Sequence, residues 1–139
     1  MAVKFFDVLP PEAHDIRETV FIKEQGFEKE YDDIDLVAKH IVIYDEETAV
    51  GTCRVFWDDE LDSYHVGRIA VLKEHRGKRL GRLLIEETEK LVKSLGGSTL
   101  KLGGQVRAAG FYDKLGFKQY GDIYLDEGYP HIPYCKEIE

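Results

Sequence analysis

Residues 63–97 contain a strand, a basic turn and a helix in direct succession, and this unit limits the possible folds more than any other stretch. Residues 63–72, SYHVGRIAVL, are rich in β-branched residues and predict a strand. From Gly77 to Leu95 the apolar residues recur at helical spacing, and LGG at 95–97 ends the helix as a glycine cap does. The apolar stripe of this helix consists of Leu80, Leu83, Leu84, Leu91, Val92 and Leu95. A helix with one apolar face that follows a strand packs on a sheet, so we expect an α/β fold.

The rest of the chain shows the same mixture of elements. Strands are expected at 3–8, in a hairpin over 40–59, and at 98–104, 117–125 and 131–138, with helices at 10–25 and 106–116. The first helix places Ile16, Val20 and Ile22 or Lys23 on one side. An acidic stretch at 28–39 indicates a second short helix or a loop. The order β-α-α-β-β-β-α-β-α-β-β predicts one mixed sheet with helices on its faces.

Length and charge limit the class of protein. A chain of 139 residues forms one domain with its own core. The net charge of -8 disfavours nucleic acid as a partner, because neutralising phosphates needs a basic face, and it leans toward cationic small molecules. There is no long apolar run for a membrane span and no secretory signal pattern at the start. Cys53 and Cys135 lie in strand-like segments without a CxxC pair, so we expect buried, reduced thiols in a cytoplasmic protein.

The basic turn (residues 76–82, RGKRLGR) has the chemistry of an anion site. The first backbone N–H groups of a helix have no partners within the helix, and the helix dipole is positive there. Gly77 and Gly81 let an anion approach the backbone closely. Full charges are added by Arg76, Lys78, Arg79 and Arg82. These features favour a phosphate or pyrophosphate site, and a solvated helix start is the alternative.

Two common nucleotide motifs do not fit the basic turn. It lacks the GK[ST] ending of a Walker loop, and the spacing of Gly77 and Gly81 is not that of GxGxxG. Nucleotide hydrolysis and dinucleotide redox chemistry are therefore disfavoured.

Three blocks of the chain resemble the GNAT superfamily of N-acetyltransferases. RIAVLKEHRGKRLGRLLIEETEKL resembles its coenzyme A segment, whose pattern is Q/R-x-x-G-x-G/A. Arg76 takes the first place and Gly81 the last, while Arg79 replaces the middle glycine, with Gly77 beside it to supply the flexibility. GFYDKLGFKQYGD is similar to the C-terminal signature of the family. IRETVFIKEQGF, DLVAKHIVIY and LDEGYPHIPYCK resemble the ElaA-like branch.

The resemblance implies a fold and a coenzyme site. It implies a single GNAT domain over 1–139 with a mixed, mostly antiparallel central sheet of about six to seven strands, splayed in the middle, and helices on both faces. It also implies acetyl-CoA as co-substrate and no metal. The implied coenzyme-binding residues are Ile69, Ala70, Val71, Arg76, Gly77, Lys78, Arg79, Leu80, Gly81, Arg82, Phe111 and Tyr112. In the family, strand backbone groups hold the pantetheine arm and backbone N–H groups of the turn hold the pyrophosphate.

The resemblance further implies a general acid and leaves the general base open. Tyr112 matches the family tyrosine beside the coenzyme sulfur, and a free phenol is protonated at neutral pH. A backbone N–H near Val71 is the expected oxyanion donor. The candidates for the base are Glu24, Asp35, His40 and His131. His131 ranks first because an imidazole suits deprotonation near neutral pH, Glu24 ranks second, and a water relay is a further possibility.

Each of these residues also has a structural interpretation. His131 can satisfy loop backbone, Glu24 can end a helix in an ion pair, and His40 at a strand start fits a structural role. Gln105 is either polar lining or a cap. The expected substrate-binding residues are Glu24, Gln25, Gln105 and His131. The acidic run at 28–35 is either a solvated surface, the favoured interpretation, or part of a pocket that attracts an amine.

The predicted function is acetyl-CoA-dependent N-acetylation of a primary amine on a small molecule or peptide, by direct attack in a ternary complex. The alternative is a catalytically silent acyl-CoA-binding module. A homodimer is possible, and neither a nucleic acid nor a membrane partner is expected.

Overall fold

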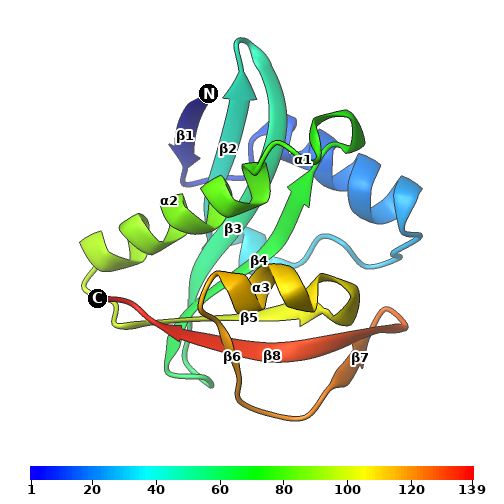
Figure 1. Cartoon of the computed structure of the whole chain (residues 1–139). Coiled ribbons are helices and arrows are strands. Elements are labelled where there is room, and N and C mark those ends of the chain that lie inside the picture. The colour runs from blue at the N-terminus through cyan, green and yellow to red at the C-terminus, as the bar shows by residue number, and fades with distance from the viewer. The chain divides into compact units, whose positions relative to one another are not determined.

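The computed structural model describes all residues, 1–139, and its secondary structure is mixed α and β (Figure 1). The strands are β1 (Ala2–Phe6), β2 (Lys39–Asp45), β3 (Thr48–Asp58), β4 (Ser63–Val71), β5 (Thr99–Gln105), β6 (Lys118–Gln119), β7 (Tyr124–Asp126) and β8 (Tyr129–Glu137). The α-helices are α1 (Pro11–Arg17), α2 (Leu80–Ser94) and α3 (Ala109–Lys114). Between them lie the π-helical segment η1 (Glu18–Glu24) and the 3-10 turns η2 (Asp33–Leu36), η3 (Lys73–His75) and η4 (Val106–Ala108).

The strands form one hydrogen-bonded sheet of mixed direction, in the order β1-β2-β3-β4-β5-β8-β6, with β7 pairing with β8. Antiparallel pairs predominate, and β4 and β5 run parallel. The β4–β5 ladder contains two residue pairs, a short ladder of the kind that the expected splay requires, whereas β5 and β8 pair over seven. The predicted α/β fold class is thus confirmed. The chain divides into two compact units, the first of 1–56 and 66–88 and the second of 57–65 and 89–139.

In the first unit, β1, β2 and β3 form an antiparallel meander around a fully buried central strand. Every residue of β2 from His40 to Tyr44 is buried. A strand that is covered on both faces has to be apolar nearly throughout, which explains the uninterrupted Ile41–Ile43 run. His40 is the polar exception, and its Nε2 donates to the carbonyl oxygen of Asp35 at 3.1 Å. Burial lowers the pKa of His40, so the ring is neutral and structural, as the sequence favoured.

The first helix changes its hydrogen-bonding register halfway along. It begins with Pro11, which tolerates the missing N–H at a helix start, and becomes π-helical at Glu18. The helical region was predicted at 10–25 and is observed at 11–24. Of the residues predicted on its inner face, Ile16 and Val20 are buried. The residues that lie inside are Ala13, Ile16, Arg17, Val20 and Phe21, while Ile22 is half-buried and Lys23 is exposed.

Arg17 is the unexpected member of this face, because its side chain is 1% exposed. Its Nε donates to Glu30 Oε2 at 2.7 Å, and its Nη1 and Nη2 donate to the Asp35 carboxylate at 2.8 and 3.0 Å. From β3, Arg54 donates to Asp32 at 2.6 Å and to Asp35 at 3.0 Å. The Arg17 cluster, as we call it, consists of Arg17, Glu30, Asp32, Asp35, Arg54 and Arg68.

The Arg17 cluster corrects the prediction for the acidic run. Glu30 and Asp35 are buried, so the favoured interpretation as a solvated surface is wrong for both. Their charges face arginines, which also removes them from any role in attracting an amine. Burial by itself would raise the pKa of Asp35, but hydrogen bonds and charge from Arg17 and Arg54 outweigh it and lower that pKa to about 2. Burial raises the pKa of Glu30, and the neighbouring arginines offset this in part.

Helix α2 and the C-terminal strands differ from prediction in their details. Helix α2 begins at Leu80 rather than Gly77. The buried residues along the helix are Leu80, Leu84, Ile85, Thr88 and Val92. Leu95, placed in the apolar stripe by prediction, is 43% exposed and lies beyond the helix. The predicted strand at 117–125 is two short strands, because Pro133 in β8 has no N–H to donate and the ladder stops there.

Cys53 and Cys135 are both free thiols. Cys53 is buried in β3, and burial raises the pKa of its thiol to about 12. Cys135 in β8 is half-buried, so the prediction of a buried thiol holds fully for Cys53 alone.

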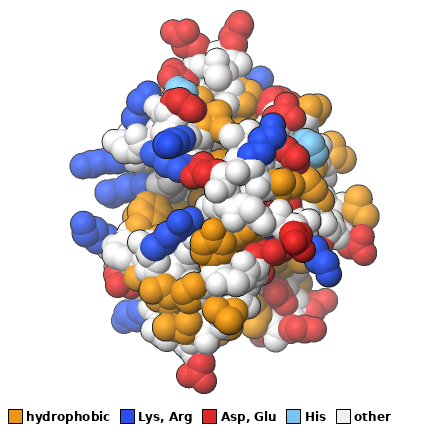
Figure 2. All heavy atoms as spheres, turned by 90° about the vertical axis from the view of Figure 1, so that its right-hand side faces the viewer, with side chains coloured by type: hydrophobic (Ala, Val, Ile, Leu, Met, Phe, Trp, Pro, Cys, Tyr) orange, Lys and Arg blue, Asp and Glu red, His pale blue; other side chains and the backbone are white.

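None of the helices has the length and apolar character needed to cross a bilayer. The surface carries both signs of charge despite the net acidity: Lys and Arg side chains gather along one side of the face in Figure 2, with acidic and apolar groups elsewhere on it.

The Arg17 cluster predicts a specific pH dependence of stability. The pKa of Asp35 is about 2 in the folded chain and 3.8 ordinarily, so its contribution is complete above pH 4 and is lost as the pH falls through 2. Asp35→Asn should therefore reduce the free energy of unfolding by about 2 kcal/mol or more at pH 7, with the gap to wild type closing between about pH 4 and pH 2.

Urea unfolding at several pH values measures this gap. Asp7→Asn is the matched control, because Asp7 pairs with Lys39 at a side chain that is 85% exposed, where solvent screens the interaction. A gap for Asp35→Asn that stays constant down to pH 2 would contradict the assignment.

Candidate active site

The basic turn lies in the first unit, between β4 and α2, and its backbone offers a row of free donors. Residues 76–79 are exposed. Gly77 and Arg79 have positive φ angles of 83° and 61°. The amides of residues 77–82 have no acceptor in the chain, since the first helical bond of α2 runs from Leu83 N–H to Arg79 O at 3.1 Å. Successive free N–H groups at a helix start form a cradle for an anion.

Arg79, which replaces the middle glycine of the family pattern, adopts a backbone conformation that favours glycine. Its φ of 61° lies in the left-handed region, where a residue with a Cβ pays about 1 kcal/mol. The turn therefore has a left-handed step at a residue that carries a side chain. Gly77, at φ 83°, supplies a second left-handed residue rather than replacing the first.

One edge of β4 also presents its backbone. Leu72 N–H donates to Val50 O at 2.9 Å, so the polar groups of Leu72 point toward β3. The backbone polar groups of successive strand residues alternate in direction. The N–H and C=O groups of Ile69 and Val71 therefore point to the edge away from β3, and those of Ala70 point toward β3. The carbonyl of Val71 confirms this direction by accepting from Arg76 Nε at 2.9 Å.

Arg76 and Glu24 bind each other. Arg76 Nη1 and Nη2 donate to Glu24 Oε2 and Oε1 at 2.7 and 2.9 Å, which is the two-pronged geometry that suits arginine and a carboxylate. The hydrogen bond from Arg76 to Glu24 raises the pKa of Arg76. A predicted coenzyme residue and a predicted base thus occupy one ion pair. Gln25 follows as the cap of η1, donating its N–H to Ile22 O.

In the second unit, Tyr112 is held in an aromatic cluster. It lies in α3 and is 8% exposed. Its ring meets those of Phe111, Phe117 and Tyr134 at centroid distances of 5.0, 6.1 and 5.5 Å. It also lies on the backbone of Gly104, where an added Cβ would stand 2.6 Å from a ring carbon.

His131 lies in β8, in agreement with the strand predicted at 131–138, and is 6% exposed. Its Nδ1 is 2.8 Å from the carbonyl oxygen of Tyr129. A carbonyl only accepts, so Nδ1 carries the proton and the neutral ring keeps its lone pair on Nε2. His131 pairs with Gln105 across the β5–β8 ladder, which places both side chains on one face of the sheet.

The chain matches known proteins over nearly its whole length. The model of the acetyltransferase (GNAT) domain matches residues 10–138, which include both units. The chain belongs to the GNAT acetyltransferase family.

Three members show the range of the likeness. The N-acetyltransferase YjcF of Bacillus subtilis is 36% identical over 125 residues, which are 88% of this chain and 88% of that protein. ElaA of Escherichia coli is 29% identical over 128 residues, 88% of this chain and 84% of ElaA, and its crystal structure covers 99% of this chain and 100% of its own with a TM-score of 0.86 at 24% identity. An aminoglycoside 6'-N-acetyltransferase complexed with coenzyme A has a TM-score of 0.76 at 19% identity, covering 100% of this chain and 98% of its own.

These matches confirm the predicted enzyme class, an N-acetyltransferase of the GNAT type, and the resemblance to the ElaA-like branch. For this GNAT chain, the structure adds the arrangement of the predicted acid and base. Gly103 and Gly104 are neighbours in β5 and so present opposite faces. Tyr112 contacts the Gly104 face, and His131 approaches the Gly103 face, where an added Cβ would be 3.9 Å from its Cδ2.

Sequence reasoning missed both glycines and Tyr124, whose hydroxyl lies over Gly103. Two consecutive glycines inside a strand are a known sign of close approach by another group, and this signal was available in the sequence.

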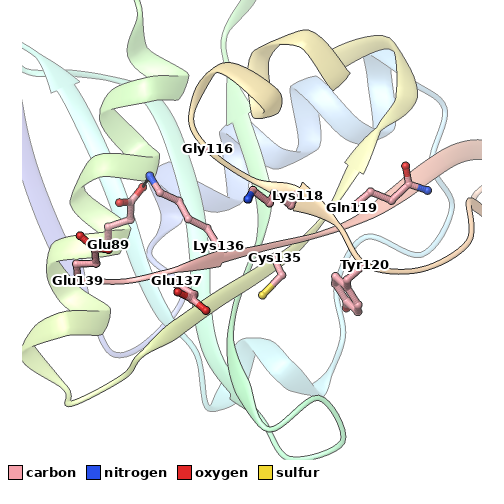
Figure 3. A pocket seen from close by; sticks show the side chains of 9 residues that line it. All are labelled: Glu89, Gly116, Lys118, Gln119, Tyr120, Cys135, Lys136, Glu137 and Glu139. Atoms are coloured by element: carbon pink, nitrogen blue, oxygen red, sulfur yellow. Dashed lines mark hydrogen bonds and ion pairs between the residues drawn. The ribbon is translucent and has the colours of Figure 1, made fainter.

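A cavity of about 700 Å³ lies elsewhere in the second unit and contains none of the predicted site residues (Figure 3). It is lined at the C-terminal end of β8 by charged side chains and Cys135. Lys136 reaches Glu89 at 3.1 Å along its wall.

The contact between Gly104 and Tyr112 can be tested by one methyl group. Gly104→Ala should push the Tyr112 ring out of its place, lower the free energy of unfolding by about 1–3 kcal/mol and reduce kcat. Gly110→Ala is the control, since no atom lies within 4 Å of a Cβ added there. Equal kcat and stability in the two variants would contradict the contact.

Proposed function

We propose that this chain is an acetyl-CoA-dependent N-acetyltransferase, formed as one domain from both units, that transfers an acetyl group to a primary amine of a small molecule or peptide by direct attack in a ternary complex. The row of free N–H groups at 77–82 supports this most, because it provides an anion cradle where the GNAT pattern expects the coenzyme pyrophosphate. Acetyl-CoA supplies an acetyl group activated as a thioester.

The residues of the first unit would hold the coenzyme. The basic turn offers backbone donors for the pyrophosphate, and the exposed side chains of Lys78, Arg79 and Arg82 add positive charge around them. Ile69 would offer its backbone groups, and Val71 its N–H, on the edge of β4 away from β3 for the amides of the pantetheine arm, since the carbonyl of Val71 accepts from Arg76. The N–H of Val71 is the proposed oxyanion donor, because that of Leu72 is bonded to Val50.

The residues of the second unit would move the protons. His131 accepts the proton of the attacking amine at Nε2, the ring nitrogen that its bond to Tyr129 O leaves with a lone pair. Tyr112 holds a proton at its hydroxyl for the departing thiolate. Gln105, paired with His131 in the ladder, lines the acceptor side.

We propose His131 rather than Glu24 as the base. Both carboxylate oxygens of Glu24 accept from Arg76, and an oxygen that is committed to a charge-assisted hydrogen bond is a weak proton acceptor. Glu24 would instead hold Arg76 in place, and Arg76 holds the carbonyl of Val71.

Calorimetric titration with acetyl-CoA tests the coenzyme site. The wild type should bind with a Kd on the order of micromolar, and Gly81→Glu should weaken binding more than tenfold, because its carboxylate repels the pyrophosphate. Ser94→Glu adds the same charge at the far end of α2 and should bind like wild type. No binding to the wild type would remove the transferase proposal together with the silent acyl-CoA-binding alternative. Binding without acetylation of any amine in a screen for thiol release would favour that alternative.

The base is tested by the separate effects of two substitutions on kcat and KM. His131→Gln should lower kcat about 100-fold or more, the usual loss for a general base. Glu24→Gln should change kcat less than threefold and raise the KM for acetyl-CoA, since Arg76 loses its partner. Steady-state kinetics with the best acceptor of the screen gives both values, and the reverse pattern would make Glu24 the base.

A further inference from the structure

Tyr124 contacts two parts of the second unit that are distant in sequence, His131 in β8 and Gly103 in β5. Its ring stacks on the imidazole of His131, with centroids 5.6 Å apart and planes 23° from parallel. Its hydroxyl lies over the backbone of Gly103, where an added Cβ would be 1.9 Å from the oxygen and 3.2 Å from Cζ. Tyr124 is therefore seated on β5 at a place that only a residue without a side chain leaves open.

The surroundings of Tyr124 show that its position depends on its contacts with His131 and Gly103. Tyr124 pairs with His131 in the β7–β8 ladder, which places the two side chains on the same face. Residues 120–128 are otherwise exposed, and Tyr124 itself is 43% exposed. An aromatic ring on an open segment gains little from burial alone, so the stack on His131 and the contact with Gly103 define its position.

His131 is consequently held from two directions. In the plane of the ring, Nδ1 donates to Tyr129 O at 2.8 Å. Perpendicular to that plane, the ring of Tyr124 covers one face. The first contact sets which nitrogen carries the proton, and the second limits rotation of the ring about its Cβ–Cγ bond. Together they fix the ring and leave Nε2 as the nitrogen that carries the lone pair.

We propose that Tyr124 is a positioning residue for the general base: seated on Gly103, its ring fixes the orientation of the His131 imidazole so that Nε2 meets the acceptor amine. This inference rests on the proposed function of His131. Tyr124 acts through the imidazole, and its hydroxyl has no part in the proton transfer. A base that samples several orientations spends less time within reach of the amine, so kcat falls while coenzyme binding is unchanged.

Three substitutions separate the contributions of the Tyr124 ring, of its hydroxyl and of its contact with Gly103. Tyr124→Leu removes the stack and should lower kcat about tenfold, with the KM for acetyl-CoA within twofold of wild type. Tyr124→Phe keeps the ring, so its kcat should stay within twofold of the wild-type value. Gly103→Ala keeps the tyrosine but pushes it off β5, and should lower kcat as Tyr124→Leu does. Gly110→Ala is the matched control for an added methyl group.

A spectroscopic measurement reports the imidazole without any reaction. In long-range ¹⁵N–¹H NMR spectra of the protein labelled at histidine, His131 should show Nδ1 protonated and a single set of signals in wild type and Tyr124→Phe. In Tyr124→Leu and Gly103→Ala the signals should shift toward the average of both tautomers, as for a mobile ring. Circular dichroism and urea unfolding establish that each variant is folded.

The outcomes separate this inference from the proposed function. If His131→Gln is slow but Tyr124→Leu and Gly103→Ala keep wild-type kcat or wild-type His131 signals, the positioning role is overturned and the base assignment stands. If His131→Gln keeps wild-type kcat, the base assignment fails, and the positioning role fails with it even where the spectra change. Loss of kcat and altered signals in both variants, with rescue by Tyr124→Phe, establish the role.

Discussion

The ion pairs around Arg17 are the constraint on which the first unit depends. A guanidinium with a side chain that is 1% exposed is tolerable only if carboxylates come to it, because an unpaired buried charge costs several kcal/mol. Glu30 and Asp35 meet this need, and the segment that carries them is thereby fastened to α1. Arg54 and Arg68 attach the same segment to β3 and β4. An irregular stretch with little apolar content thus obtains a fixed path beside β3 and β4.

The same interaction shows where prediction from the sequence reaches its limit. Apolar periodicity predicted the order of elements, the β4–turn–α2 unit and the fold class, because burial of an apolar stripe is a local property of the pattern. It could not predict that Arg17 faces inward, since the carboxylates that permit this lie 13 and 18 residues further along the chain. The break between β6 and β7 depended on Pro133 in a different strand, which is again a partner distant in sequence.

For the candidate site, residue types were easier to predict than partners. The turn at 76–82 was predicted as an anion site from its glycines, its charges and its place at a helix start, whereas Tyr112 and His131 came from motif resemblance. The structure gives each a surrounding that suits its proposed role. The pairing of Glu24 with Arg76 was not foreseen as a direct contact, because the two residues are 52 positions apart. The left-handed Arg79 illustrates the converse: a residue that departs from the motif glycine still adopts a backbone conformation that favours glycine.

The adjacent glycines of β5 also matter for anyone who would re-engineer this enzyme. Because Gly103 and Gly104 open onto opposite faces of the sheet, the strand acts as a partition one backbone thick between two rings, Tyr124 and Tyr112. Residues around Tyr124 could be randomised in a library while the wall on the Tyr112 side keeps its shape. The two glycine codons themselves would have to be kept constant in such a library, since any side chain at either position collides with a ring. The two faces of this one strand can in this sense be varied separately.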